Sequence, residues 1–286
     1  MSVTVGPALI WLLLLMFVPL AFLVTVSFAT VNESYQIVWQ FSVSNYIDLF
    51  QSEELRVWET PFFQGYVISL FIAIVTTVVT LLLALPVAYF LARRSGRVFK
   101  IVFYFVLLPF FTVYLVRAYS WYLMFGGSGV INATLQKVGL IDQPLAAFDY
   151  GLIPIIITLA HAFFPYMLFT LYASFDGLDF SLVEAAQDLG ATRRETFTDV
   201  VLPLVMPGIV GGSVFVFVPS LGAFVTPQIL GQSKIQMIGQ LIGTRVNTLY
   251  AIGYGSAASL FIIIPTIIAF VIGFKYAAFS TVGGER

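Results

Sequence analysis

Few residues of this sequence have the chemistry needed for covalent or metal catalysis. It contains one histidine, His161, and no cysteine. Disulfides and thiolate metal ligands are therefore excluded, and few residues are suited to a catalytic nucleophile paired with a base. No GxxxxGK[ST] stretch, whose backbone amides would cradle nucleotide phosphates, occurs in the chain. We therefore expect no catalytic residue, no metal site and no cofactor in this chain, and any ATP-driven step needs a partner protein.

The densest polar signals lie between residues 175 and 205, and they predict two short helices around a glycine. Ser181 followed by Glu184 has the spacing of a capping box, in which the hydroxyl accepts from the third helical amide and the carboxylate reaches back to the cap amide. The first helix should therefore start at Ser181, run to Leu189 and stop at Gly190, which tolerates a positive φ.

A second capping-box spacing joins Thr192 to Glu195. It predicts that another short helix begins at once and continues toward Leu202. Pro203 should end this turn before the next apolar segment, because proline has no amide hydrogen to donate. The expected motif is therefore a helix, a glycine break and a helix.

The first of these helices carries a narrow apolar stripe, since apolar residues recur on it at spacings of three and four. Such a stripe needs a partner surface. In the alternative interpretation, both helices lie on lipid headgroups or pack beneath the spans of their own chain. The stripe consists of Leu182, Ala185, Ala186 and Leu189.

The composition of the chain is very apolar, and it indicates that the elements that position this loop are membrane-spanning helices. Of 286 residues, 60% are hydrophobic and 9% are charged, and the mean hydropathy is +0.99, whereas soluble domains average about a quarter charged residues. The chain therefore needs lipid as its solvent and is expected to be an all-α membrane protein. A net charge of −1 without a long basic run excludes a nucleic-acid partner.

Six stretches are long and apolar enough to cross a membrane, which takes about 20 residues of helix. The first has an alternative interpretation as a cleaved signal peptide. Its apolar run is too long for one and no lysine or arginine precedes it, so we expect a retained helix. The predicted spans are residues 7–29, 66–92, 101–123, 152–174, 206–228 and 254–278.

Basic residues orient these spans, because short loops rich in Lys and Arg stay in the cytoplasm. Both termini and the 175–205 loop then lie in the cytoplasm. Three basic residues fall on the outer side of the membrane, so the excess of Lys and Arg on the cytoplasmic side is moderate. They are Lys137, Lys234 and Arg245. The orienting residues, all in the short loop after the second span, are Arg93, Arg94, Arg97 and Lys100.

The segment 30–65 is placed outside by this orientation. Its part from Val43 to Leu55 mixes apolar and polar residues, and fits an interfacial amphipathic helix or a surface loop equally well. The segment is acidic, with one basic residue, Arg56, against Glu33, Asp48, Glu53, Glu54 and Glu59.

The 175–205 loop closely resembles the EAA signature of binding-protein-dependent ABC importer permeases: EAA, three residues, G, nine residues, I, one residue, LP. Val200 stands where the signature has isoleucine and keeps a β-branched apolar side chain. The other matching residues are Glu184, Ala185, Ala186, Gly190, Leu202 and Pro203.

This resemblance implies a type I ABC importer permease in the bacterial inner membrane, with six transmembrane helices in a single domain over residues 1–286. The loop would be the coupling helix that docks in a groove of an ATPase subunit. Implied partners are an ABC ATPase dimer that uses ATP and Mg, a second permease of a different homologous chain, and a periplasmic substrate-binding protein. Glu184 is expected to cap its own helix while Ala185 and Ala186 make the close contact.

Four further stretches, LVEAAQDLGA, GLIDQPLA, LPFFTVYLVRAYSW and VPSLGAFVTPQILG, resemble parts of the spermidine and putrescine permeases. The likeness extends over nearly the whole chain and implies a polyamine substrate, although it is much less specific for the substrate than for the fold. An opine or amino-acid derivative is the alternative substrate, since related permeases share most of these features.

Polar residues within the spans are candidates for lining the translocation path. Arg117 shares a helical face with Tyr114 and Trp121, and its alternative role is to extend toward the headgroups. His161 precedes Pro165 by about one turn, where a hydrogen bond to a neighbouring helix at a kink is the alternative to substrate contact.

The fifth span offers hydroxyl and aromatic side chains at helical spacing. Ordinary helix packing explains the pattern almost as well, because Gly208 and Gly212 promote close contact in the same segment. The candidate path residues in this span are Ser213, Phe217, Ser220 and Phe224.

No aspartate or glutamate falls within a predicted span. A secondary transporter usually needs such carboxylates for its coupling ion, and a channel needs a filter repeat that is not visible here. Polyamine ammonium groups would have to rely on aromatic faces and hydroxyls, or on acids of the partner permease. Specificity would then reside in the binding protein.

Overall fold

The computed structural model describes residues 2–32, 36–51, 56–94, 96–232 and 234–282. Contacts divide the chain into two compact units, one formed by Met1–Val67 with Met237–Pro265 and the other by Ile68–Gln236 with Thr266–Arg286. The interpretation of residues 1–286 as one permease domain stays a prediction. The predicted acids Glu33, Glu53 and Glu54 lie outside the described residues.

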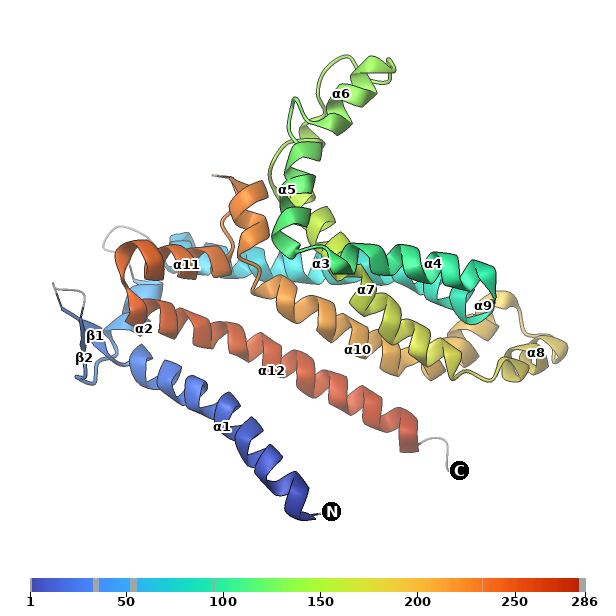
Figure 1. Cartoon of the computed structure of the whole chain (residues 1–286), viewed down its shortest axis with the longest axis horizontal. Helices are drawn as coiled ribbons and strands as arrows, with labels where there is room; N and C mark the ends of the chain where they lie inside the picture. The colour runs from blue at the N-terminus through green and yellow to red at the C-terminus, as the bar shows by residue number, and fades with distance from the viewer. Residues whose placement is uncertain (1, 33–35, 52–55, 95, 233, 283–286) are drawn as a thin grey trace. The chain divides into compact units, whose positions relative to one another are not determined.

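Helices make up most of the described chain (Figure 1), as the composition predicts. The helices are α1 (Ser2–Ser27), α2 (Ser44–Phe50), α3 (Pro61–Ala92), α4 (Arg97–Leu107), α5 (Tyr114–Met124), α6 (Val130–Lys137), α7 (Leu152–Asp176), α8 (Phe180–Asp188), α9 (Arg193–Glu195), α10 (Leu202–Leu221), α11 (Ile238–Leu249) and α12 (Ile252–Val282).

Five helical segments of the described chain are long and apolar enough to cross a membrane: Leu9–Ser27, Pro61–Ala92, Leu152–Asp176, Arg193–Leu221 and Ile252–Gly273. They correspond to five of the six predicted spans. A sixth is reached if the helices Arg97–Phe111 and Tyr114–Met124, bent by 98° at their junction, count as one span.

The prediction of an unbroken helix over residues 101–123 is wrong. Pro109 lies in a 3₁₀ turn that ends α4, and Thr112 and Val113 are extended before α5 starts. The Thr112 hydroxyl donates to the Pro109 carbonyl at 2.7 Å and satisfies one of the carbonyls that the helix leaves open. A proline therefore sets the break, and a threonine stabilises it.

The fifth span differs from prediction at both ends. The helix runs continuously from Arg193 to Leu221, so Pro203 does not end a turn. In a regular α-helix the proline ring would clash with the carbonyl four residues before it. That carbonyl lies in a π-helical turn over Thr196–Val201, where the backbone is wider than in an α-helix. At the other end the helix stops at Leu221 instead of residue 228, with Gly222 as its C-cap.

The first unit is built around α2, α11 and the first turns of α3 and α12. Its strands β1 (Thr30–Val31) and β2 (Ile37–Val38) form a short antiparallel hairpin. Of the two interpretations left open for Val43 to Leu55, a helix is present over Ser44–Phe50 as α2, while residues 52–55 lie outside the described chain and the interfacial location stays a prediction. The core residues of the first unit are Leu49, Phe62, Ile238, Leu241, Ala257 and Ala258.

In the second unit, α3, α7 and α10 share one apolar core (Figure 1). Gly208 and Gly212 lie in the contact between α10 and α7, where a side-chain carbon on Gly208 would lie 2.7 Å from the Thr170 carbonyl oxygen. The predicted role of these glycines in close packing is confirmed. The core includes Ala84, Ala88, Leu91, Met167, Leu171, Phe175, Val205 and Val216.

Candidate functional site

Asp179 fixes the start of α8, the first helix of the predicted coupling loop. Its carboxylate accepts a hydrogen bond from the Ser181 amide at 3.0 Å, and the Ser181 hydrogen bonds hold the pKa of Asp179 below its ordinary value. The predicted box of Ser181 and Glu184 is therefore wrong: Glu184 lies well inside the helix with an exposed side chain. The helix ends as predicted before Gly190, whose φ is +91°.

The second predicted capping box is confirmed. The Thr192 hydroxyl accepts from the Glu195 amide at 3.3 Å, and the Glu195 carboxylate accepts from the Thr192 amide at 2.8 Å. The latter bond lowers the pKa of Glu195. Because the folded pKa is lowered, this carboxylate stabilises the loop above its ordinary pKa, and the contribution is lost as pH falls through the lowered value.

The apolar stripe of α8 faces away from the described chain. Leu182 is 47% exposed and Leu189 is 90% exposed, and Ala185 between them is exposed as well. Ala186 is half-buried. Exposed apolar side chains in a row on a short capped helix form a surface suited to a partner protein.

The opposite side of α8 is anchored in the core of the second unit. Val183 is buried among residues of α3, α7 and α10. Phe180 lies under the guanidinium of Arg93, with 5.4 Å from Cζ to the ring centroid, and Arg93 also donates to the Tyr89 hydroxyl at 3.1 Å. The inner side of α8 therefore belongs to the same core as three membrane-spanning helices.

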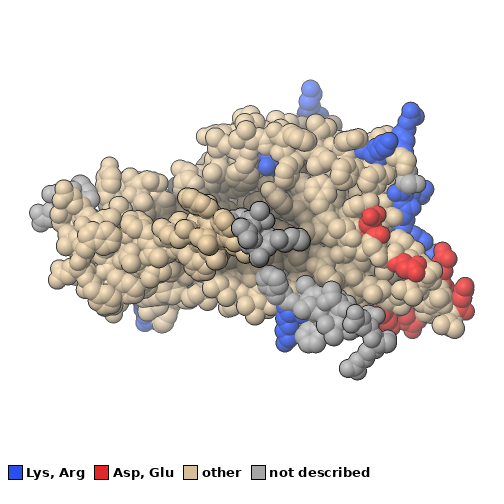
Figure 2. All heavy atoms as spheres, turned by 60° about the horizontal axis from the view of Figure 1, so that its bottom comes forward, with Lys and Arg blue, Asp and Glu red and all other residues tan. Residues whose placement is uncertain are grey.

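Many of the charged side chains drawn in Figure 2 gather at the right of the view. The contact of Arg93 with Phe180 places the basic loop after α3 at the same end of the second unit as α8. The exposed charges of this end include Arg94, Arg97, Asp188, Arg193 and Arg194. The two polar segments that the sequence assigns to one membrane face thus lie together.

The predicted path residues of α5 point toward α7 and toward the π-helical turn Pro227–Gly231. Tyr114 shares a hydrogen bond with Thr226. Arg117 lies 5.8 Å from the Tyr114 ring centroid and donates to the Ala162 carbonyl of α7 at 3.4 Å. Its buried Nε has no partner among the described residues. The guanidinium therefore joins two helices.

His161 and Trp121 form a second link between α5 and α7. The Trp121 indole donates to Nδ1 of His161 at 3.2 Å, and the rings meet edge to face with centroids 5.5 Å apart. Two mostly apolar cavities, of about 380 and 370 Å³, are both lined by this pair. The expected face of Tyr114, Arg117 and Trp121 is confirmed, and His161 meets it.

Replacement of Trp121 by phenylalanine should lower the stability of the second unit by about 1 kcal/mol, because the His161 acceptor loses its donor. Chemical unfolding in detergent measures the change. Tyr119→Phe is the matched control, since Tyr119 lies on the same helix and is 53% exposed. Equal stabilities for the two variants would contradict a structural role for the bond.

The predicted face of the fifth span is only partly formed. Ser213 donates to the Ile209 carbonyl of its own helix at 2.6 Å, and Phe217 is half-buried. Ser220 is buried, and its hydroxyl has no partner among the described residues. Phe224 lies beyond the end of α10, so its predicted place on one continuous helical face is wrong.

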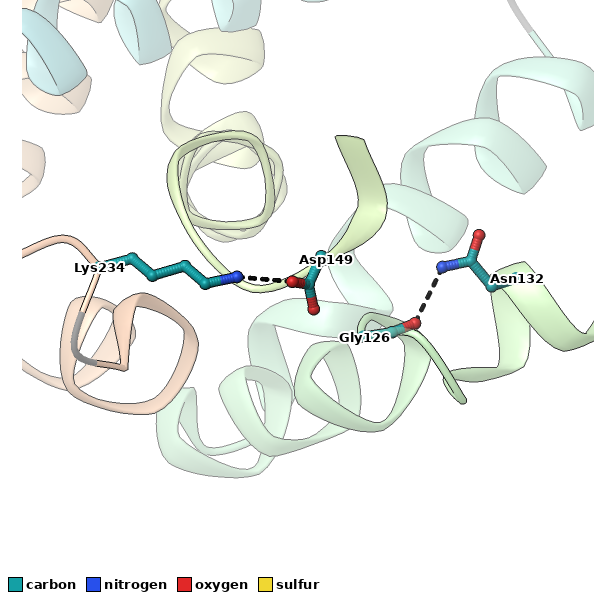
Figure 3. A network of polar contacts seen from close by, with 4 residues as sticks. All are labelled: Gly126, Asn132, Asp149 and Lys234. Atoms are coloured by element: carbon teal, nitrogen blue, oxygen red, sulfur yellow. Dashed lines mark hydrogen bonds and ion pairs between the residues drawn. The ribbon is translucent and has the colours of Figure 1, made fainter. Parts of the chain in front are cut away.

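A polar network that sequence patterns did not indicate holds the segment between α5 and α7 (Figure 3). Buried Asn132 donates to the Gly126 carbonyl at 2.9 Å and accepts from the Leu145 amide at 3.0 Å. Lys234 pairs with Asp149, and this contact lowers the pKa of the carboxyl. The ion pair joins residues far apart in sequence, so local spacing gives no signal for it.

No group of three or more metal-ligating side chains occurs in the part of the chain that the structure describes. The arrangement is instead a membrane-spanning helix bundle with an outward-facing apolar helix anchored to its core. These features define a polytopic membrane protein of the transport-permease class.

The comparisons place this permease in a family. Residues 67–279 match the binding-protein-dependent transport system inner membrane component family. The chain is 31% identical to the spermidine/putrescine transport system permease protein PotB of Escherichia coli (strain K12), over 87% of this chain and 88% of that protein. It is 30% identical to PotB of Haemophilus influenzae, over 91% and 87% respectively.

Solved structures show the same fold. A bacterial alginate ABC transporter, in complex with an alginate pentasaccharide-bound periplasmic protein, contains a chain that superposes with a TM-score of 0.68 at 18% identity, covering 95% of this chain and 91% of that one. The chain belongs to the binding-protein-dependent inner-membrane permeases. It is a multi-pass inner-membrane subunit of an ABC importer with the type I fold, and a transport subunit rather than an enzyme.

Proposed function

We propose that this chain forms part of the translocation path for spermidine and putrescine, and that α8 is the helix through which an ATPase drives it. The names of the similar permeases support the substrate. One observation carries the coupling role: α8 exposes Leu182, Ala185 and Leu189 outward while Val183 on its other side is buried in the core of the spans.

The proposed complex has two ATPase subunits, which use ATP and Mg, and a second permease of a different homologous sequence. A periplasmic binding protein delivers the substrate, in keeping with the family description. Both termini lie in the cytoplasm in this proposal. The shared location of the basic loop and α8, through Arg93 and Phe180, supports that orientation.

Weak substrate binding by the permease follows from the chemistry of the α5–α7 contact. Tyr114, Trp121 and His161 supply aromatic faces and polar atoms there, and the charged group is the cation Arg117. A polyamine gains no carboxylate partner from these residues. Selection is therefore assigned to the binding protein, and the permease provides a passage of low affinity.

Arg117 supports a second candidate substrate, an opine or another amino-acid derivative, because a guanidinium pairs well with a carboxylate. The two candidates predict different competition. If the polyamine assignment is right, labelled spermidine should be taken up, and its uptake should be blocked by excess putrescine and left unchanged by amino acids. If the alternative is right, labelled spermidine should not be taken up, while a labelled opine or amino-acid derivative should be.

The permease purified without its binding protein should show no tight binding of spermidine in calorimetry. An affinity in the low micromolar range, around 10⁻⁶ M or about −8 kcal/mol, would contradict the low-affinity passage. As a positive control, the complex purified together with its binding protein should retain the substrate, and mass spectrometry of the released ligand identifies it.

A further inference from the structure

A polar cavity of about 750 Å³ lies within the first unit, between α2, α11 and the start of α12. Ligand pockets in proteins measure roughly 300–1,000 Å³, so this space is large enough for a small polar group. The transport proposal makes no use of it. Its lining includes Asp48 and Arg245.

The floor of the cavity is fixed by hydrogen bonds. The Asn45 side-chain amide donates to the carbonyls of Ser27 and Ala29 at 2.9 and 2.8 Å, and it packs directly against Gly253. The Ser27 hydroxyl also bonds to the Tyr46 hydroxyl at 2.7 Å. These contacts hold α2 against the end of α1 and the start of α12, so the cavity is a built feature of the unit.

Two opposite charges line this cavity without neutralising one another. Asp48 and Arg245 do not form an ion pair with one another. The ion pair found among the residues that the structure describes is that of Lys234 with Asp149. The Arg245 guanidinium is held over the Tyr254 ring, 5.2 Å from its centroid. A ligand that carries an anionic and an ammonium group on one short linker would match both charges.

The depth of the cavity in the membrane follows from where the spans end. The apolar span of α1 ends at Ser27, α3 begins at Pro61, and α12 begins at Ile252. Pro61 and Gly253 are themselves part of the lining. A cavity made where three spanning helices meet their polar connections lies at the level of the lipid headgroups.

Exposed aromatic residues of the same unit agree with that level. Trp39 is 66% exposed and Trp58 is 57% exposed, and the Trp58 ring lies 5.4 Å from the guanidinium carbon of Arg56. Tryptophan gathers at the boundary between headgroups and hydrocarbon, where its ring is apolar and its N–H reaches water. These residues agree with a headgroup-level position of the first unit's polar segments.

We propose that this cavity binds the headgroup of a zwitterionic phospholipid with a primary amine, phosphatidylethanolamine in chemical class. Its phosphate lies at Arg245 and its ammonium group at Asp48. A free phosphoethanolamine-like solute has the same charges, but the headgroup depth of the cavity favours the lipid. The bound lipid fills the space between α2, α11 and α12 and fixes this unit in the membrane.

The test uses the intact transporter purified through this chain, washed with detergent and then titrated with defined lipids. Native mass spectrometry should show that phosphatidylethanolamine is retained and that phosphatidylglycerol, which has a phosphate but no amine, is not. Arg245→Gln and Asp48→Asn should each reduce retention about tenfold, the effect of losing one charge-assisted contact. Lys137→Gln and Asp142→Asn make the same charge changes at exposed positions outside the cavity and should leave retention unchanged.

Equal retention of the two lipids by the wild-type chain would overturn the proposal, and this comparison needs no variant to fold. Unchanged retention in both Arg245→Gln and Asp48→Asn would overturn it as well. Displacement of the lipid by an equal concentration of free phosphoethanolamine would assign the cavity to a soluble zwitterion and overturn the lipid assignment. Retention that is selective, sensitive to both variants and resistant to phosphoethanolamine supports it.

Discussion

Ala185→Asp should abolish ATP-driven uptake while the chain still folds and inserts. Ala185 lies on the exposed face of α8, so a carboxylate there is solvated when the chain is alone. If α8 docks in an apolar groove, the same carboxylate is buried without a partner, at a cost of about 3 kcal/mol, which corresponds to a loss of roughly a hundredfold in coupling. Uptake and ATPase rate in reconstituted vesicles measure the effect.

Gln187→Glu is the matched control for this prediction. It also adds one negative charge to an exposed position of α8, but it lies off the stripe formed by Leu182, Ala185 and Leu189. Uptake by this variant should stay within about twofold of wild type, a change of less than 0.5 kcal/mol. Wild-type uptake in Ala185→Asp, or equal losses in the two variants, would refute docking through the stripe.

Glu184→Gln separates the contact role of Glu184 from the capping role predicted for it. Asp179 performs the capping, so the glutamine variant should leave the helix intact.

Local signals were decisive at Thr192 and Glu195, where nothing competes for the cap. They misled at Ser181 because Asp179 is an equally good cap and lets Phe180 and Val183 reach their partners from within the helix.

Hydropathy located every apolar span but not its internal geometry. The 98° bend between α4 and α5 depends on Pro109 and on one hydroxyl hydrogen bond from Thr112. A window of average hydropathy does not register either feature. The same limit explains why α10 ends early, because the Gly222 cap leaves the surrounding sequence just as apolar.

The candidate path could be predicted as one helical face and no further. Tyr114, Arg117 and Trp121 share that face because of their spacing. Their partners Thr226 and His161 are 112 and 40 residues away from Tyr114 and Trp121 respectively, and no local rule links residues at such distances. The tertiary fold alone brings these side chains together, which is also true of Lys234 and Asp149.

Gly208→Ala should strongly destabilise the second unit, because an added methyl group would clash with α7. The added carbon would lie 2.7 Å from the Thr170 carbonyl oxygen and closer still to the Ser174 hydroxyl. Backbone atoms of α7 cannot move aside without separating the two helices, so we expect a loss of about 1–3 kcal/mol in unfolding free energy. Unfolding of the purified chain in detergent, followed by circular dichroism, measures it.

Gly211→Ala is the control that isolates this contact. It makes the same change three residues along α10, where an added carbon meets nothing within 4 Å, and alanine in a helix interior is favoured over glycine by about 0.5–1 kcal/mol. Gly211→Ala should therefore leave stability unchanged or raise it. Because α8 is anchored in the core that α10 shares with α7, the proposed coupling through α8 predicts that Gly208→Ala slows uptake as well as destabilising the unit. If both alanine variants unfold alike, the close approach of α10 to α7 does not hold these helices together.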